Sequence, residues 1–201
     1  MITLSHPLIF IRHGQTDWNK EARLQGGQDI PINALGALQA QRNGRALSEL
    51  FAGGAFALDD FHFTASPLSR CIATMGHVRD ALGLAPDDGF DRDPRLREIT
   101  FGQWEGNTFA ELEAAQADAV AAREADKWGF VPPGGESYAM LSERIAPWLE
   151  SLDRPTLAVS HGGVMRAVRG LLFDLPSAEI PQLDTPQDRV FVYEDGQGMW
   201  V

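Results

Sequence analysis

Two histidines in the 201-residue chain stand at the end of an apolar run and directly before a glycine. His13 follows the run 8–12, Leu-Ile-Phe-Ile-Arg, and His161 follows the run 156–160, Thr-Leu-Ala-Val-Ser. Each run has the composition of a short buried strand, and parallel strands end at the same edge of a sheet, so we expect both imidazoles at one edge. A neutral imidazole beside the cation of Arg12 is suited to meet an anionic substrate.

The elements that would position these histidines alternate between strand and helix signals, which is typical of a layered α/β domain. Strands are expected at 8–11, 61–65 and 156–160, and helices at 35–51, 68–82, 108–127, 137–152 and 164–173. Segments rich in glycine and proline separate them. We expect one domain over 1–201, with the segment 103–136 forming a helical lid or excursion.

Composition narrows the class of protein. The chain has 17 Lys and Arg against 28 Asp and Glu, a formal charge of −11, which argues against a nucleic-acid partner or an anionic membrane surface. The single cysteine, Cys71, excludes an internal disulfide and fits a reducing compartment. The amino-terminal segment makes a poor signal peptide, so a cytoplasmic protein is expected.

Four segments together resemble the signatures of one family. The stretch 12–19, Arg-His-Gly-Gln-Thr-Asp-Trp-Asn, is similar to the opening signature of the histidine phosphatase superfamily, which includes cofactor-dependent phosphoglycerate mutase and many phosphatases. The segments 66–70, 96–102 and 159–163 resemble its later signatures, in the family's order. The resemblance implies a three-layer α/β/α sandwich with a mostly parallel central sheet.

The resemblance also implies a role for individual residues in phosphoryl transfer through a phosphohistidine. By that match His13 is the nucleophile, Glu98 is the proton donor and His161 completes the catalytic group. The residues expected around the phosphate are Arg12, Arg70, Asn19, Thr16, Gln25, Gly26 and Gly162. No metal and no other cofactor is implied.

The chemistry of these side chains agrees with the implied roles. Forked arginine donors suit the charge that spreads over phosphoryl oxygens, and a carboxylic acid can protonate a poor alkoxide leaving group. Structural alternatives stay open: Arg70 as a solvated helix residue, Glu98 as the ion-pair partner of Arg95 or Arg97, and Thr16 with Asn19 as caps of a short turn.

The reaction itself has two candidate outcomes. A mutase needs extra cations and a closing lid, whereas Arg123 and Lys127 are the only cations between Phe101 and Pro132. We therefore favour a phosphatase acting on a small phosphorylated metabolite, with a phosphoglycerate mutase as the alternative. Two further classes remain, an inactive phosphate-binding regulatory module and a metal-dependent hydrolase. The identity of the substrate and the oligomeric state stay open.

Overall fold

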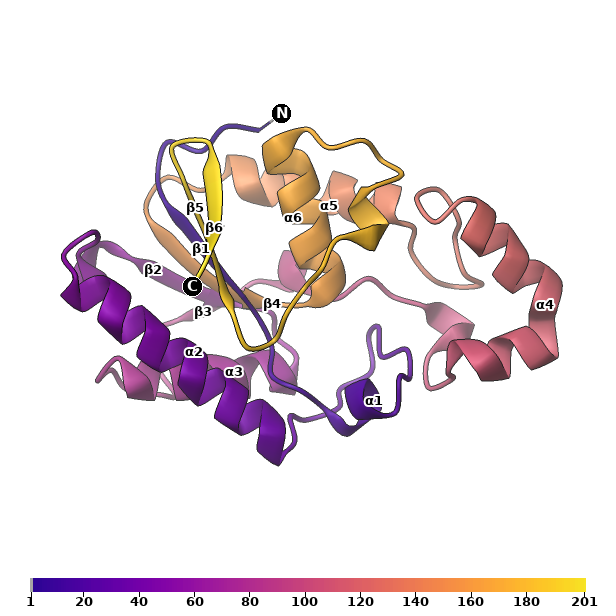
Figure 1. The fold of residues 1–201 in the computed structure, drawn as a ribbon, viewed down its shortest axis with the longest axis horizontal. Coiled ribbons are helices and arrows are strands. Elements are labelled where there is room, and N and C mark those ends of the chain that lie inside the picture. The colour runs from indigo at the N-terminus through magenta and orange to yellow at the C-terminus, as the bar shows by residue number, and fades with distance from the viewer. Residues whose placement is uncertain (1) are drawn as a thin grey trace.

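A six-stranded sheet in the order β3-β2-β4-β1-β5-β6 runs through the computed structural model, which describes residues 2–201 (Figure 1). The first four strands in this order are parallel to one another, β5 is antiparallel to β1, and β6 is antiparallel to β5. The strands are β1 (Leu8–Arg12), β2 (His62–Ala65), β3 (Asp91–Arg92), β4 (Thr156–Ser160), β5 (Val190–Glu194) and β6 (Gln197–Trp200). The predicted α/β class with a mostly parallel sheet is confirmed.

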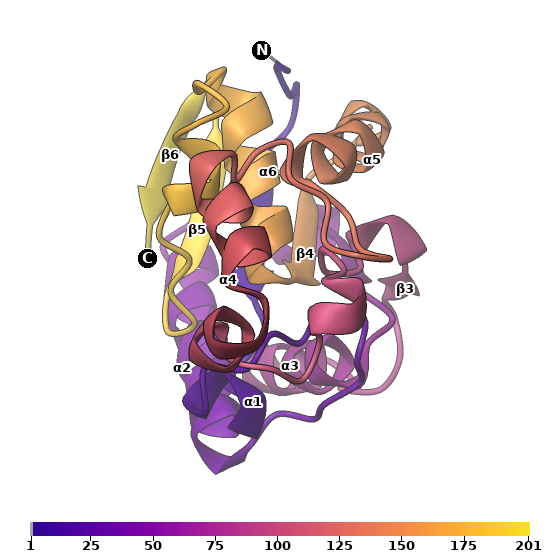
Figure 2. The ribbon, with the colours of Figure 1, turned by 90° about the vertical axis from the view of Figure 1, so that its right-hand side faces the viewer.

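Both faces of the sheet are covered by helices, and β1 shows this in its alternation. Leu8 and Phe10 pack into the apolar core formed with α5 and α6, whereas Ile9 and Ile11 pack into the core formed with α2 and α3. Figures 1 and 2 show these helix pairs on opposite sides of the sheet. A strand buried on both faces reads as a continuous apolar run, which is why 8–11 was recognisable in the sequence.

Helices α2 to α6 agree with the five predicted ranges to within a few residues, whereas the short helix α1 was not predicted. They are α1 (Asp17–Lys20), α2 (Ala34–Ala52), α3 (Ser69–Ala81), α4 (Phe109–Ala125), α5 (Tyr138–Glu150) and α6 (Gly162–Phe173), with short 3-10 helices η1 (Leu58–Asp60), η2 (Pro94–Leu96), η3 (Gly102–Trp104) and η4 (Ile180–Gln182). No helix among residues 2–201 is both long enough and apolar enough to cross a membrane.

The hairpin of β5 and β6 is an element that the sequence analysis missed. Asp195 and Gly196 connect the two strands with positive φ angles of 48° and 78°. An Asp-Gly pair between strand-like segments is a strong hairpin signal because both positions of a type I′ turn need positive φ. The signal was therefore present in the sequence, and it adds two antiparallel strands to the parallel sheet.

Helix α4 lies apart from the sheet, at the right-hand side of Figure 1. Its backbone is non-helical at Gln116, with φ −146° and ψ 49°, so the helix expected at 108–127 is interrupted there. A small apolar cluster built on Trp104, Leu112 and Val120 holds the segment together. Trp104 Nε1 also donates a hydrogen bond to Gln116 Oε1 over 3.3 Å. Movement of the segment 103–136 as a lid stays a prediction.

Candidate active site

His13 and His161 lie side by side at one edge of the sheet. Strands β1 and β4 are parallel neighbours in which Arg12 faces Ser160, so the residue after each strand is a histidine. The backbone N–H of His13 donates to the Ser160 carbonyl over 2.9 Å, and the ring centroids lie 5.2 Å apart at an interplanar angle of 65°. The register of two strands thus brings together residues 148 positions apart in the sequence, 161 minus 13.

The ring of His13 is held as a neutral imidazole with one nitrogen available. His13 Nδ1 lies 2.8 Å from the Gly14 carbonyl oxygen. A carbonyl only accepts, so Nδ1 carries the proton and Nε2 keeps its lone pair. Burial, followed by the nearby guanidiniums of Arg70 and Arg12, lowers the pKa of His13 well below its ordinary value of 6.5. The lowered pKa favours the uncharged imidazole, whose Nε2 could act as a nucleophile.

His161 is fully buried, and both of its ring nitrogens make hydrogen bonds. Its Nδ1 accepts a hydrogen bond from Arg70 Nε over 3.3 Å, and its Nε2 donates to Ser66 Oγ over 2.7 Å. Burial, followed by Arg70, lowers its pKa well below 6.5, so His161 is neutral in this structure. A protonated His161 would add a further donor to a phosphate, but burial and the neighbouring arginines disfavour that charged form.

Arg70 is the most enclosed cation of the site, with no exposed surface. Its Nη1 donates to the Gln28 carbonyl over 2.6 Å and its Nη2 to the Gly26 carbonyl over 3.0 Å. These contacts and the His161 ring fix the guanidinium in one orientation. The alternative in which Arg70 is a solvated helix residue is therefore wrong.

Arg12 supplies a second guanidinium at the same edge. Its Nη1 donates to the Thr185 carbonyl over 2.7 Å, whereas its buried Nε has no hydrogen-bond partner among the described residues. Burial lowers its pKa to about 10, which leaves the side chain charged at neutral pH. A buried donor without a partner is costly, and a bound anion would satisfy it.

Gly14 allows helix α2 to approach the end of β1. A Cβ on Gly14 would lie 2.2 Å from the Gly36 carbonyl oxygen, and one on Gly36 would lie 2.2 Å from the Gln15 carbonyl oxygen. The φ of Gly14 is not among the positive values of the chain, so this position does not need glycine for a left-handed turn. Glycine is needed at position 14 because two backbones are in contact there, and this contact places the first turn of α2 against the His13 loop.

Glu98 faces the same cavity from the loop after η2. Its Oε1 accepts from the backbone N–H groups of Gly163 and Ile99, each over 3.0 Å, and the Gly163 contact places the carboxylate at the amino terminus of α6. A Cβ on Gly163 would lie 2.5 Å from this oxygen, so glycine permits the contact. Arg95 pairs with Asp93 at 2.7 Å, and no ion pair joins Glu98 to Arg95 or Arg97 among residues 2–201. The ion-pair alternative for Glu98 is therefore wrong.

A cavity of about 160 Å³ collects most of the expected site residues. Eight of the ten line it: Arg12, His13, Asn19, Gln25, Gly26, Arg70, Glu98 and Gly162. His161 lies behind the wall, and so does Thr16, whose Oγ1 caps α1 by accepting from the Asn19 N–H over 3.1 Å and donates to Gln25 Oε1 over 2.9 Å. The capping interpretation thus holds for Thr16, while Asn19 both closes the cap and faces the cavity.

Other lining residues were not anticipated. They are Arg23, Leu24, Ile99, Phe101, Tyr138, Gly163, Arg166 and Thr185. Thr185 belongs to the segment 183–189, here called the strap, which leads from η4 to β5. From the strap, Gln187 Nε2 also donates to the His13 carbonyl over 3.0 Å and to Asn19 Oδ1 over 3.1 Å. No residue spacing in the sequence predicts these contacts, because the strap has no regular secondary structure.

Fold and site together define a class of protein. One edge of the mostly parallel sheet carries the neutral ring of His13 with a free Nε2, two guanidiniums and a carboxylate. Such a set of groups can bind a phosphate and can supply both a nucleophile and an acid for phosphoryl transfer. Among residues 2–201 no group of three or more His, Cys, Asp or Glu side chains is arranged to hold a metal ion.

The chain belongs to the histidine phosphatase superfamily, branch 1, whose family model matches residues 8–201. It is 32% identical to a glucosyl-3-phosphoglycerate phosphatase of Mycobacterium tuberculosis over 190 residues, which cover 88% of this chain and 79% of the relative. A 2,3-bisphosphoglycerate-dependent phosphoglycerate mutase of Bifidobacterium longum is 28% identical over 220 residues, covering 95% of this chain and 87% of the relative.

A solved structure shares the whole fold. A mycobacterial glucosyl-3-phosphoglycerate phosphatase in complex with VO3 superposes with a TM-score of 0.77 at 29% identity, covering 97% of this chain and 96% of that one. The comparisons therefore support a phosphoric monoester hydrolase over the mutase alternative.

Proposed function

We propose that this chain hydrolyses small phosphomonoesters through a phosphohistidine on His13, without a metal ion. The observation that carries the proposal is the Nδ1 contact of His13 with the Gly14 carbonyl, which leaves Nε2 as the nucleophile in a cavity lined by Arg12 and Arg70. A histidine nucleophile divides one difficult displacement into two easier ones.

In the first step the Nε2 lone pair of His13 forms a bond to phosphorus, and the ester P–O bond breaks with its electron pair on the leaving oxygen. Glu98 in its acid form transfers its proton to that oxygen. Arg12 and Arg70 face the equatorial oxygens, where negative charge accumulates. Asn19, Gln25, Gly26 and the backbone at Gly162 complete the phosphate-binding wall.

In the second step water attacks the phosphorus of the phosphohistidine. The Glu98 carboxylate takes a proton from this water, and the electron pair of the N–P bond returns to Nε2 of His13. Inorganic phosphate leaves, and both side chains regain their starting protonation. His161 supports both reaction steps by positioning the groups it contacts, the His13 ring and Arg70.

Hydrolysis is favoured over mutase activity by the origin of the cavity's charges. The guanidiniums that line it come from Arg12, Arg23, Arg70 and Arg166, all outside the segment 103–136. The cations of that segment are engaged elsewhere, since Arg123 and Lys127 both pair with Glu124 at 2.8 Å. Relatives named glucosyl-3-phosphoglycerate phosphatases make that phosphorylated glycerate a first substrate to test.

The buried, single Cys71 suits a reducing compartment, and we place the protein in the cytoplasm.

The test is hydrolysis of p-nitrophenyl phosphate in excess chelator. The phosphoenzyme is then trapped and its lability in acid is measured. We expect turnover with an optimum below neutral pH, inhibition by vanadate, and a phosphoenzyme that His13→Ala abolishes. His62→Ala is the matched control, because His62 is half exposed and pairs with Asp91 away from the site. A phosphoenzyme that survives His13→Ala would refute the assignment.

The same assays separate the other candidate classes. Loss of turnover in chelator would indicate a metal-dependent hydrolase, and phosphate binding without turnover would indicate a regulatory module. Interconversion of 2- and 3-phosphoglycerate that requires 2,3-bisphosphoglycerate and outpaces hydrolysis would indicate a mutase. A panel of phosphorylated metabolites that includes glucosyl-3-phosphoglycerate would then rank substrates by kcat/KM.

A further inference from the structure

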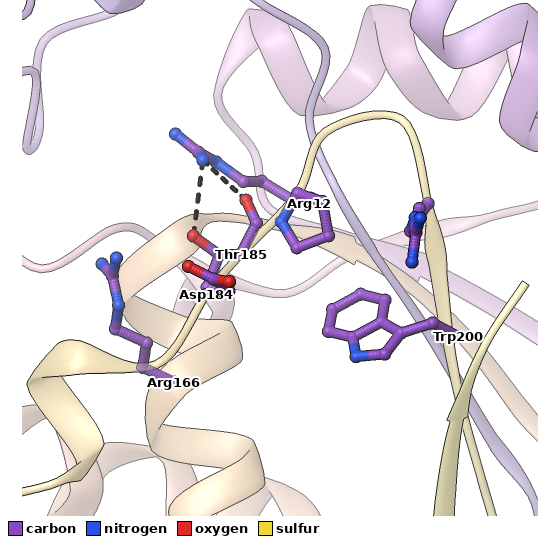
Figure 3. A pocket seen from close by; sticks show the side chains of 7 residues that line it. Arg12, Arg166, Asp184, Thr185 and Trp200 are labelled. Carbon is purple, nitrogen blue, oxygen red and sulfur yellow. Dashed lines mark hydrogen bonds between the residues drawn. The ribbon is translucent and has the colours of Figure 1, made fainter.

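A second and larger cavity lies beside the catalytic one, between helix α6, the strap and strand β6 (Figure 3). Its volume is about 730 Å³. We call it the strap pocket, and its lining residues are Arg12, Arg166, Asp184, Thr185, Pro186, Arg189 and Trp200. None of the roles proposed above for the two chemical steps uses Asp184, Arg189 or Trp200.

The strap pocket is electropositive in an acidic protein. Three guanidiniums, of Arg12, Arg166 and Arg189, line it against the single carboxylate of Asp184, while the whole chain carries a formal charge of −11. Within residues 2–201, none of these three arginines has a carboxylate at ion-pair distance. Guanidiniums that have no carboxylate partner and are gathered in one hollow form a site for an anion.

The strap pocket and the catalytic cavity share part of their walls. Arg12, Thr185 and Arg166 line both, so the two spaces adjoin at these side chains. Arg166 is fixed at this boundary, because its Nε donates to the Leu183 carbonyl over 2.8 Å and its Nη1 to the Tyr138 hydroxyl over 3.3 Å. The strap pocket therefore adjoins the space beside His13, with Arg166 at the boundary.

We propose that the strap pocket is a subsite for a second anionic group, a carboxylate or a phosphate, on the alcohol portion of the substrate. The inference rests on the proposed phosphatase function and names the substrate class of that activity. Arg166 receives the group at the boundary, Arg189 receives it when the spacer is longer, and the Trp200 ring provides an apolar wall for the carbon chain between. Figure 3 shows Trp200 and Arg166 on different sides of the hollow.

The test is a set of linear phosphomonoesters of increasing length that carry a terminal carboxylate. Each is compared with the partner of equal length that ends in a hydroxymethyl group, as 3-phosphoglycerate is with glycerol 3-phosphate. A parallel set of diol bisphosphates and monophosphates distinguishes a phosphate preference from a carboxylate preference. The measured quantity is the ratio of kcat/KM within each pair, which rises above one for spacers that reach the subsite.

Three variants test the subsite, and two of them make the same change of charge at different places. Arg189→Glu exchanges an attraction for a repulsion, and because exposed charge pairs are worth up to about fivefold each way, we expect the best ratio to fall about tenfold. Asp184→Asn removes the pocket's carboxylate and should raise the ratio. Arg154→Glu makes the same charge change on an exposed arginine that pairs with Asp153, away from the pocket, and should leave the ratio unchanged.

The outcomes separate this inference from the function on which it rests. Ratios near one at every spacer length, or equal effects of Arg189→Glu and Arg154→Glu, would overturn the subsite while hydrolysis of the uncharged partners leaves the phosphatase standing. Failure of the wild type to hydrolyse either member of any pair would overturn the proposed function and the subsite with it.

Discussion

Ser66 Oγ accepts a hydrogen bond from His161 Nε2 over 2.7 Å, and both residues are fully buried. The contact fixes the proton of His161 on Nε2, so that Nδ1 can accept from Arg70 Nε. One hydroxyl thereby determines the tautomer of a histidine and, through it, helps to orient the guanidinium of Arg70. Second partners of this kind orient the groups that touch the substrate.

Ser66→Ala should weaken both catalysis and stability. The buried Nε2–H of His161 loses its acceptor, which costs about 1–3 kcal/mol of unfolding free energy. We expect kcat to fall about tenfold, with a smaller change in KM for p-nitrophenyl phosphate, and Ser66→Thr to restore part of it because the hydroxyl returns. Denaturant unfolding and steady-state kinetics measure the two effects.

Ser142→Ala is the matched control for this prediction. Ser142 is also buried, yet its Oγ has no hydrogen-bond partner among the described residues. The same substitution should therefore leave kcat unchanged and cost no hydrogen bond. Equal kcat for Ser66→Ala and the wild type would contradict a positioning role for Ser66.

Glu98→Gln should slow transfer in proportion to the difficulty of the leaving group. The amide keeps an oxygen for the Gly163 N–H, which the carboxylate contacts at 3.0 Å, but it cannot donate an acid proton. Removal of a general acid costs about 10²-fold or more with an alkyl phosphate. The loss should be several times smaller with p-nitrophenyl phosphate, whose phenolate leaves without a proton.

The comparison of leaving groups also provides the check on Glu98. Vanadate affinity should stay within about threefold of the wild type. Glu98 does not form an ion pair with the bound anion, so its replacement by glutamine should change the binding free energy by less than about 1 kcal/mol. An equal loss of kcat with both substrates would show that Glu98 does not protonate the leaving oxygen. Glu113→Gln, on the exposed part of α4, is the control for the substitution itself.

The two buried histidines predict how stability depends on pH. Both have a pKa lowered well below 6.5, so below that pH the unfolded chain binds protons that the folded chain does not. The free energy of unfolding must then fall as the pH falls through 6.5, by up to about 1.4 kcal/mol per pH unit for each histidine. Unfolding in urea at several pH values between about 5 and 7 measures the slope.

Single replacements assign the slope to residues. His13→Gln should remove close to half of it, because one of the two protons no longer titrates in the unfolded chain. His77→Gln, at a half-buried position outside the catalytic cavity, is the control and should leave the slope as it is. The carboxylates with lowered pKa, among them Asp93 and Glu111, titrate at lower pH and do not enter this window. A flat profile over the window would contradict the neutral state of the histidines.

The sequence predicted the parts of the site that are carried by regular elements. His13 and His161 follow buried strands whose apolar runs are visible, and parallel neighbours must end at one edge. The helix expected at 68–82 includes Arg70, and the structure has Arg70 in the first turn of α3. The roles of the individual residues in catalysis stay predictions that the variants above test.

The strap and its contacts could not be predicted in the same way. Thr185 reaches Arg12, and Gln187 reaches His13 and Asn19, over more than 160 positions of sequence. An irregular segment has no periodicity, so its course is determined by tertiary contacts alone. The lowered pKa of His161 could not be predicted for a related reason, since its burial beside Arg70 depends on the packing of three separate elements.

The contact between Gly14 and Gly36 predicts a strong effect of a single methyl group. Alanine at position 14 would place a Cβ 2.2 Å from the Gly36 carbonyl oxygen, and backbone on both sides leaves neither partner free to move alone. Either α2 shifts or the His13 loop does, and the fixed relation of His13 Nδ1 to the Gly14 carbonyl changes with it. We expect Gly14→Ala to lower stability by about 2–4 kcal/mol and to reduce kcat at least tenfold.

Gly53→Ala, at the carboxyl-terminal cap of α2, provides the opposite expectation. The Cβ would meet its nearest atom, the Leu50 carbonyl oxygen, at 3.4 Å, and the φ of −69° suits alanine. Because alanine restricts the unfolded chain, this variant should be neutral or more stable by up to about 1 kcal/mol, with unchanged kcat. Thermal unfolding and p-nitrophenyl phosphate turnover of both variants measure the contrast. Equal stability of Gly14→Ala and Gly53→Ala would show that the approach of α2 to the His13 loop does not hold the nucleophile in place.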